Sequence, residues 1–216
     1  MYLIERVSKQ IASSTAKALN LDKDREEVIA YGALNFLHTM MTTVLLVLFG
    51  LIFGLLLEVL LIALTSAAIR KYSGGMHASS PNHCAVISLL LFGGLSLAVK
   101  YIPLFTYPVA VLIYQAVILT TALVLFSILC PVDSPNKRIT NPERRRKLRR
   151  TSIVMVLLFQ VLTVPLWIWN IKTGADTALR LIACTSTGLA WQVLSITFIG
   201  RYIIKKIEFL LTRMGI

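Results

Sequence analysis

Hydrophobic residues fall into long blocks along this chain, separated by short polar connections. The first block runs from residue 28 to 69 and is interrupted by His38 and Glu58. One helix of that length would extend about 63 Å, roughly twice the thickness of a bilayer's hydrocarbon core. We therefore expect the block to fold back near Gly50 to Gly54, giving spans at 28–49 and 52–69. A turn at Glu58 is the alternative.

Four more apolar blocks follow, at residues 84–99, 104–130, 151–171 and 177–200. Before the six predicted spans, residues 2–19 place Leu3, Ile4, Val7 and Ile11 at helical spacing among polar residues. This spacing is typical of an amphipathic helix on a membrane surface. An ordinary solvated leader is the alternative. The pattern predicts an all-α, polytopic integral membrane protein with about six transmembrane helices. We assign residues 1–27 to the interfacial segment and 28–216 to a single transmembrane domain.

Composition supports this class of protein. Of 216 residues, 56% are hydrophobic and 15% are charged, against about 25% charged in a typical soluble domain. The mean hydropathy is +0.76. Three cysteines lie far apart and form no metal-binding or disulfide pattern.

The net charge of +12 is distributed unevenly. Segments 70–83 and 131–150 hold two and eight Lys and Arg residues, whereas the other connections, around residues 100–103 and 172–176, hold only Lys100 and Lys172. This pattern is typical of cytoplasmic loops rather than of nucleic-acid binding. It predicts a multi-pass protein of the cell membrane, in contact with its lipids, with both termini and both basic segments in the cytoplasm.

The segment RKYSGGMHASSPNHC, residues 70–84, interrupts the apolar pattern. Gly74 and Gly75 favour a turn after the second span. Ser80 and Pro81 are typical of a helix start, as N-cap and first helical residue. Cys84 then lies in the first turn, where the positive end of the helix lowers the pKa of a thiol and favours the thiolate. The neighbouring Arg70 and Lys71 would strengthen that effect.

Histidines flank this cysteine. His77 precedes the helix in a loop that can fold back, which is the arrangement that a thiol nucleophile and its general base need. His83 is the rival base, but it should project about 100° away from Cys84 around the helix. A structural hinge, or a metal site formed by the two histidines and Cys84, would use the same residues.

The second polar segment, residues 131–150, is expected to be a basic loop. Asp133 or Asn136 could orient His77 as a third member of a triad, although both residue types also form turns beside prolines. The basic residues favour anchoring near anionic lipid.

Two motifs in order resemble a known family. The segment 70–84 is similar to the GG-x-H-x6-C core of the accessory gene regulator B family, membrane cysteine endopeptidases of Gram-positive quorum sensing. The segment CPVDSPNKRI, residues 130–139, is similar to that family's P-x-D-x-P-N-K segment. The resemblance covers nearly the whole chain.

The resemblance implies a function. The family removes the carboxy-terminal tail of an AgrD-type precursor peptide and passes the remaining acyl group to an internal thiol or hydroxyl, which gives a thiolactone or lactone. It implies Cys84 as nucleophile and His77 as base, a homo-oligomer (a dimer), and neither metal nor cofactor. Because such precursors end in charged tails, we expect a set of basic residues to steer the tail: Arg70, Lys71, Lys137, Arg138, Arg144, Arg145 and Arg146. The alternative function is a transporter or metal exporter using His77, His83 and Cys84.

Overall fold

The computed structural model describes residues 3–75, 80–133 and 139–214. The elements are α1 (Leu3–Ala18), α2 (Lys23–Phe53), α3 (Leu56–Ser73), α4 (Pro81–Tyr101), the 3-10 helix η1 (Pro103–Thr106), α5 (Pro108–Leu129), α6 (Pro142–Thr173), α7 (Asp176–Ile196) and α8 (Phe198–Arg213). Within the described ranges the regular structure is helical, apart from an isolated bridge between Gly74 and Val132. The all-α prediction is confirmed.

The chain divides into two units, residues 1–45 and 46–216, with the boundary inside α2. In the first unit, the helix expected over residues 2–19 is α1. Asp22 caps the next helix by accepting a hydrogen bond from the Arg25 amide at 2.9 Å, so α2 begins at Lys23 rather than at residue 28. That α1 lies on the membrane surface stays a prediction.

Five helices are long and apolar enough to cross a membrane: α2, α4, α5, α6 and α7. The second predicted span, at residues 52–69, is a helix too, α3, but its 18 residues include three charged ones, Glu58, Arg70 and Lys71, so it does not qualify as a candidate span. The protein is a multi-pass membrane protein.

The fold-back of the first apolar block occurs where the glycines predicted it. Helix α2 ends at Phe53, Gly54 has a φ of 62°, and α3 begins two residues later. The Leu55 amide donates to the Gly50 carbonyl at 2.7 Å and closes the turn. The alternative turn at Glu58 is wrong, because Glu58 lies inside the first turn of α3.

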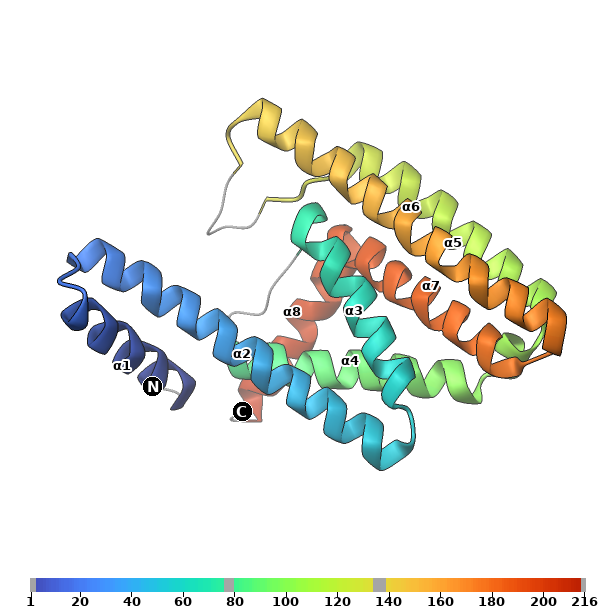
Figure 1. Cartoon of the computed structure of the whole chain (residues 1–216), viewed down its shortest axis with the longest axis horizontal. Coiled ribbons are helices and arrows are strands. Elements are labelled where there is room, and N and C mark those ends of the chain that lie inside the picture. Colours follow the sequence, from blue (N-terminus) through green and yellow to red (C-terminus); the bar gives the residue numbers. More distant parts are fainter. Residues whose placement is uncertain (1–2, 76–79, 134–138, 215–216) are drawn as a thin grey trace. The chain divides into compact units, whose positions relative to one another are not determined.

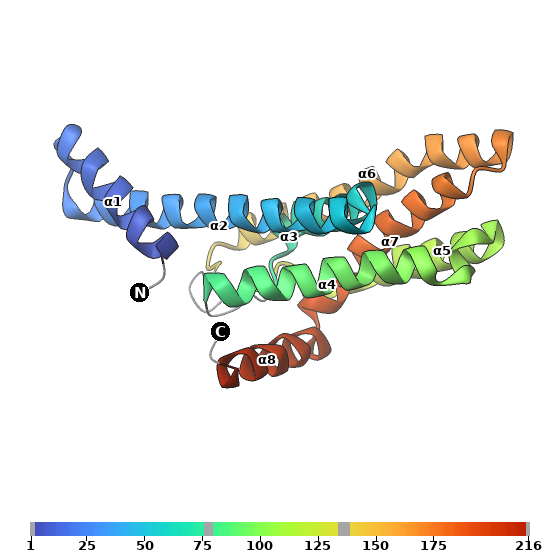
Figure 2. The same cartoon turned by 90° about the horizontal axis from the view of Figure 1, so that it is seen from below.

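The second unit is organised around α7. Helices α3, α4, α5 and α6 all pack against it (Figures 1 and 2). At Gly188 a Cβ atom would lie 2.6 Å from the Ile62 carbonyl oxygen, so α3 and α7 approach too closely for any larger residue. Small residues at helix contacts commonly allow the backbones of two membrane helices to come this close.

Boundaries in the second half of the chain also differ from the sequence prediction. Helix α6 begins at Pro142, because the Asn141 side chain accepts from the amides of Glu143 and Arg144, so much of the expected 131–150 loop is helical. The expected 177–200 span ends at Ile196, and Thr197 caps a separate helix, α8, that the sequence analysis missed.

Candidate active site

Cys84 lies in the first turn of α4, as the sequence predicted. The Ser80 Oγ accepts from the His83 amide at 3.1 Å and caps the helix, with Pro81 at its first position. The Cys84 amide donates to the Ser80 carbonyl at 3.0 Å. The Cys84 side chain is half-buried and forms no disulfide. The helix start therefore places a thiol at the positive end of α4.

Arg70, in the last turn of α3, interacts electrostatically with this thiol. Burial lowers the pKa of Arg70, whereas the charge of Cys84 raises it. Its Nε atom is shielded from solvent and makes no hydrogen bond among the residues that the structure describes. Lys71 is different, because its side chain is exposed and its Nζ lies 5.7 Å from the centre of the Tyr72 ring.

The turn after α3 depends on glycine. Gly74 and Gly75 have φ values of 75° and 137°, a region that other residues rarely adopt. A Cβ atom at Gly74 would collide with the carbonyl oxygen of Val132. The Val132 amide donates to the Ser73 carbonyl at 2.9 Å, so the turn lies directly against the segment that follows α5.

Gln192 of α7 holds this turn from the bundle side. Its side chain is fully buried, and its Nε2 donates to the Ser73 Oγ at 2.8 Å and to the Gly74 carbonyl at 2.9 Å. Its Oε1 accepts from the Ser66 Oγ at 3.5 Å. A buried amide with both ends hydrogen-bonded fixes its neighbours firmly, because breaking such bonds leaves polar groups unpaired.

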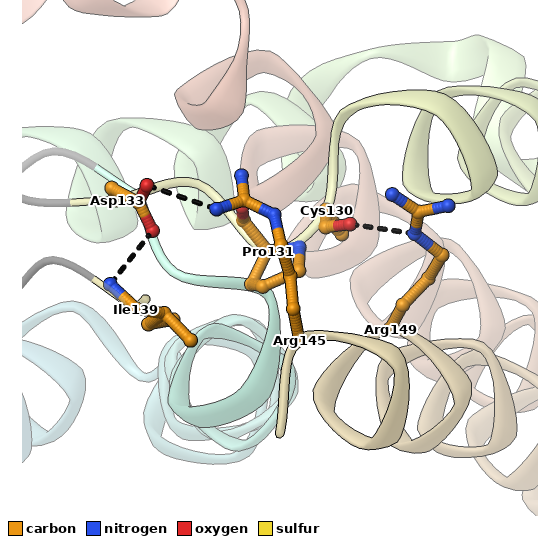
Figure 3. Close-up of polar contacts among 6 residues, drawn as sticks. All are labelled: Cys130, Pro131, Asp133, Ile139, Arg145 and Arg149. Atoms are coloured by element: carbon orange, nitrogen blue, oxygen red, sulfur yellow. Dashed lines mark hydrogen bonds and ion pairs between the residues drawn. The ribbon is translucent and has the colours of Figure 1, made fainter. Parts of the chain in front are cut away.

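Two arginines of α6 fix the segment after α5 (Figure 3). The Arg149 Nε donates to the Cys130 carbonyl at 2.8 Å, and Arg145 donates to the Pro131 carbonyl at 3.1 Å. Arg145 also pairs with the Asp133 carboxylate at 3.0 Å. The same carboxylate accepts from the Ile139 amide at 3.4 Å. The Cys130–Pro131 peptide is cis.

The basic residues proposed to steer a substrate tail therefore separate into groups. Arg70 interacts electrostatically with Cys84, and Arg145 donates hydrogen bonds to Asp133 and Pro131. Arg144 and Arg146 are exposed on α6. Arg146 lines an open groove of about 420 Å³ together with Glu143, Lys147, Arg150, Thr151 and Val154.

Four of the predicted site residues lie outside the described residues: His77, Asn136, Lys137 and Arg138. Their roles stay predictions. Gly75, which immediately precedes the first of these gaps, is buried, and Ser80, which follows it, is half-buried. The segment that carries His77 thus runs from a buried glycine to the N-cap of the helix that carries Cys84.

His83 points to another element. Its Nδ1 lies 3.6 Å from the Glu208 carboxylate of α8, and its side chain is almost fully buried. Within ranges 3–75, 80–133 and 139–214, no three His, Cys, Asp or Glu side chains are grouped as metal ligands. The other two cysteines, Cys130 and Cys184, are fully buried in the core. Cys130 follows the last residue of α5, and burial raises the pKa of its thiol to about 12.

The fold and this site define a class: a multi-pass helical membrane protein with a half-buried cysteine at a helix start, beside an arginine. The model of the family described as accessory gene regulator B matches residues 8–196. The chain therefore belongs to that family, whose members take part in accessory gene regulator quorum sensing. No solved structure matches.

Two relatives come from Clostridium perfringens. The AgrB-like protein 2 of strain 13 is 26% identical over 208 residues, which cover 95% of this chain and 97% of that protein. The AgrB-like protein of strain SM101 is 25% identical over the same extent. The similarity thus runs along nearly the full length of both chains.

Neither the role of Gln192 nor helix α8 was predicted from the sequence. Gln192 lies 108 positions after Cys84, and nothing in its local sequence relates it to the glycine turn. A signal for α8 existed, because Thr197 precedes a stretch in which apolar and basic residues alternate at helical spacing.

Proposed function

We propose that the protein is a membrane cysteine endopeptidase that cleaves the carboxy-terminal tail from an AgrD-type precursor and promotes closure of the remaining peptide into a thiolactone or lactone. The observation that carries the proposal is the position of Cys84, in the capped first turn of α4 and within the electrostatic reach of Arg70. Membership of the accessory gene regulator B family supports the substrate class.

The first step needs a thiolate. The amino-terminal end of α4 and the Arg70 guanidinium both favour the ionised form of Cys84. His77 accepts the thiol proton, and the Cys84 sulfur attacks the scissile carbonyl carbon. As the carbon–nitrogen bond breaks, His77 returns the proton to the departing amine of the tail. The precursor's amino-terminal part is then an acyl thioester on Cys84.

The second step is acyl transfer within the bound peptide. An internal thiol or hydroxyl of the peptide attacks the thioester carbonyl, loses its proton to His77, and expels the Cys84 thiolate. With an attacking thiol, one thioester is exchanged for another, so the step is close to isoenergetic. Water would hydrolyse the same intermediate, and the partly buried position of Cys84 limits its access.

Basic residues of α6 supply the recognition of an acidic tail. Arg144 and Arg146 are exposed, whereas Arg145 is paired with Asp133. Lys71, Lys137 and Arg138 belong to the same proposal. Asp133 or Asn136 orients His77. The site faces the cytoplasm, where precursor peptides are made, and the enzyme works as a homo-oligomer in the cell membrane.

A cleavage assay in membranes tests the proposal. Membranes carrying the protein are incubated with an epitope-tagged precursor, and release of the tail is followed by gel mobility and mass. Cys84→Ala and His77→Ala should each abolish release. Cys130→Ala should preserve it, since that thiol is buried and protonated. Tail release by the Cys84→Ala protein would refute the proposal.

A further inference from the structure

Helix α8 has a buried apolar face and an exposed face that carries aromatic and basic residues. Ile204 and Leu211 are buried against Ile87 of α4 and Trp191 of α7. The opposite face is exposed. Helix α8 lies beyond residue 196, where the match to the family model ends.

The exposed face has an aromatic ridge between two rows of cations. Phe198, Tyr202 and Phe209 fall within about 40° of one another around the helix and are 57–78% exposed. Four basic residues flank this ridge, two on each side: Arg201 with Lys205, and Lys206 with Arg213. The Arg213 guanidinium lies 4.9 Å from the centre of the Phe209 ring. The acid of this helix, Glu208, faces inward, with its side chain 17% exposed.

The chain places this helix where a span leaves the bilayer. The candidate span α7 ends at Ile196, and α8 begins at Phe198. At Gly200 a Cβ atom would collide with the Leu194 carbonyl oxygen, so the chain turns sharply there. Figure 1 shows α8 running across the direction shared by α6 and α7. A helix in this position is well placed to lie along a membrane surface.

We propose that the exposed face of α8 docks on an anionic bilayer surface, and that the docked helix holds the first turn of α4, and with it Cys84, in position. Aromatic side chains favour the level of the lipid headgroups, and flanking Lys and Arg residues bind anionic lipid. A second copy of the chain fits this face poorly, because two faces with four cations each would repel.

The coupling to the site runs through the buried face. Glu208 lies 3.6 Å from the Nδ1 of His83, the residue immediately before Cys84. Ile87, one turn further along α4, packs in the same cluster as Ile204 and Leu211. Any shift of α8 is therefore transmitted to the turn that carries the thiol.

The test uses the full chain in nanodiscs of phosphatidylcholine alone or of an equal mixture with phosphatidylglycerol. Hydrogen–deuterium exchange reports on the backbone of residues 198–213, and the rate of Cys84 alkylation, measured on its own peptide by mass, reports on the site. Neither readout uses a precursor peptide, so failure of the proposed reaction and failure of this inference are distinguishable.

Phosphatidylglycerol should slow exchange in α8 about tenfold and change the alkylation rate of Cys84. Lys205→Gln with Lys206→Gln should lose both responses, whereas Lys100→Gln with Lys172→Gln, which removes the same charge elsewhere, should keep them. Glu208→Gln should keep slow exchange but lose the response of Cys84.

Equal exchange of α8 in the two kinds of nanodisc would overturn the docking. If phosphatidylglycerol slows exchange in α8 but leaves the alkylation rate of Cys84 unchanged, the coupling would be overturned. Protection of α8 in phosphatidylcholine alone that grows with the number of copies per disc would assign the face to a second copy and also overturn the proposal.

Discussion

The Gln192 Nε2 donates hydrogen bonds to the Gly74 carbonyl at 2.9 Å and to the Ser73 Oγ at 2.8 Å, and so ties the central helix α7 to the turn that leads toward Cys84. Gly74 in turn lies against Val132, which follows α5. One buried amide therefore sets the position of the turn between α3 and α4.

Gln192→Leu should reduce the reactivity of Cys84 and the rate of precursor processing. The substitution leaves the Gly74 carbonyl and the Ser73 hydroxyl without their donor and should cost about 1–3 kcal/mol of folding free energy. Thermal unfolding in detergent and Cys84 alkylation measure the two effects.

Gln115→Leu is the matched control. Gln115 is also a buried glutamine, bonded to Gln160, Thr163 and Trp167, and it lies about 22 Å along α5 from Cys130. Its loss should lower stability to a similar extent and leave the alkylation rate unchanged. An equal loss of Cys84 reactivity in both variants would mean that Gln192 contributes only to stability.

Arg70→Gln should shift the pH profile of Cys84 alkylation upward. The charge of Cys84 raises the pKa of Arg70, and the interaction is mutual, so the guanidinium stabilises the thiolate. Without it the thiol should ionise at higher pH, so a smaller fraction of Cys84 should be thiolate below the midpoint. The rate at high pH should be preserved.

Lys71→Gln provides the comparison for that experiment. Lys71 is adjacent in sequence but exposed, with its Nζ beside the Tyr72 ring. Its profile should match that of the unchanged protein. An identical shift in the two variants would mean that general surface charge, rather than Arg70, sets the ionisation of the thiol.

Gly74→Ala should disrupt the turn. Its φ of 75° costs an alanine about 1–2 kcal/mol, and the added Cβ would collide with the Val132 carbonyl. Gly94→Ala is the control, because no heavy atom lies within 4 Å of its Cβ position on α4 and alanine favours a helix. Processing should fall at least tenfold in the first variant only; normal processing by Gly74→Ala would contradict the role of the turn.

Neutralising Arg144 and Arg146 together should weaken processing of a precursor with an acidic tail. We expect KM to rise with kcat unchanged, and the difference from the unchanged protein to shrink at high salt, because exposed charges are screened. Arg145 is left intact because it bonds to Asp133 and Pro131. Lys100→Gln with Lys172→Gln serves again as the control, and an equal rise in KM there would remove the steering role.

Local signals in the sequence predicted much of this molecule. Ser80 and Pro81 indicate the start of α4, Gly54 indicates the fold-back, and the apolar blocks correspond to helices. These features could be predicted because each preference acts within a few residues. The charge of the 142–150 segment suggested a loop, but Asn141 and Pro142 cap a helix there.

Contacts between distant segments could not be predicted in the same way. The sequence offered Arg70 and Lys71 as equal partners of Cys84, and only packing distinguishes the buried guanidinium from the exposed ammonium. Gln192 resembles any polar residue in a span until α3 and α7 are brought together. Such contacts depend on which faces of the helices meet, and periodicity alone does not determine that.

The central claim is that Cys84 carries the acyl intermediate, and the mass of its peptide tests this most directly. The protein is co-expressed with a precursor whose ring-closing residue is replaced by alanine, so that the second step is blocked. The peptide containing Cys84 should gain the mass of the precursor without its tail, less one water, and hydroxylamine should remove the gain. Tail release with an unmodified Cys84, or with the adduct on Cys130 or Cys184, would contradict the account.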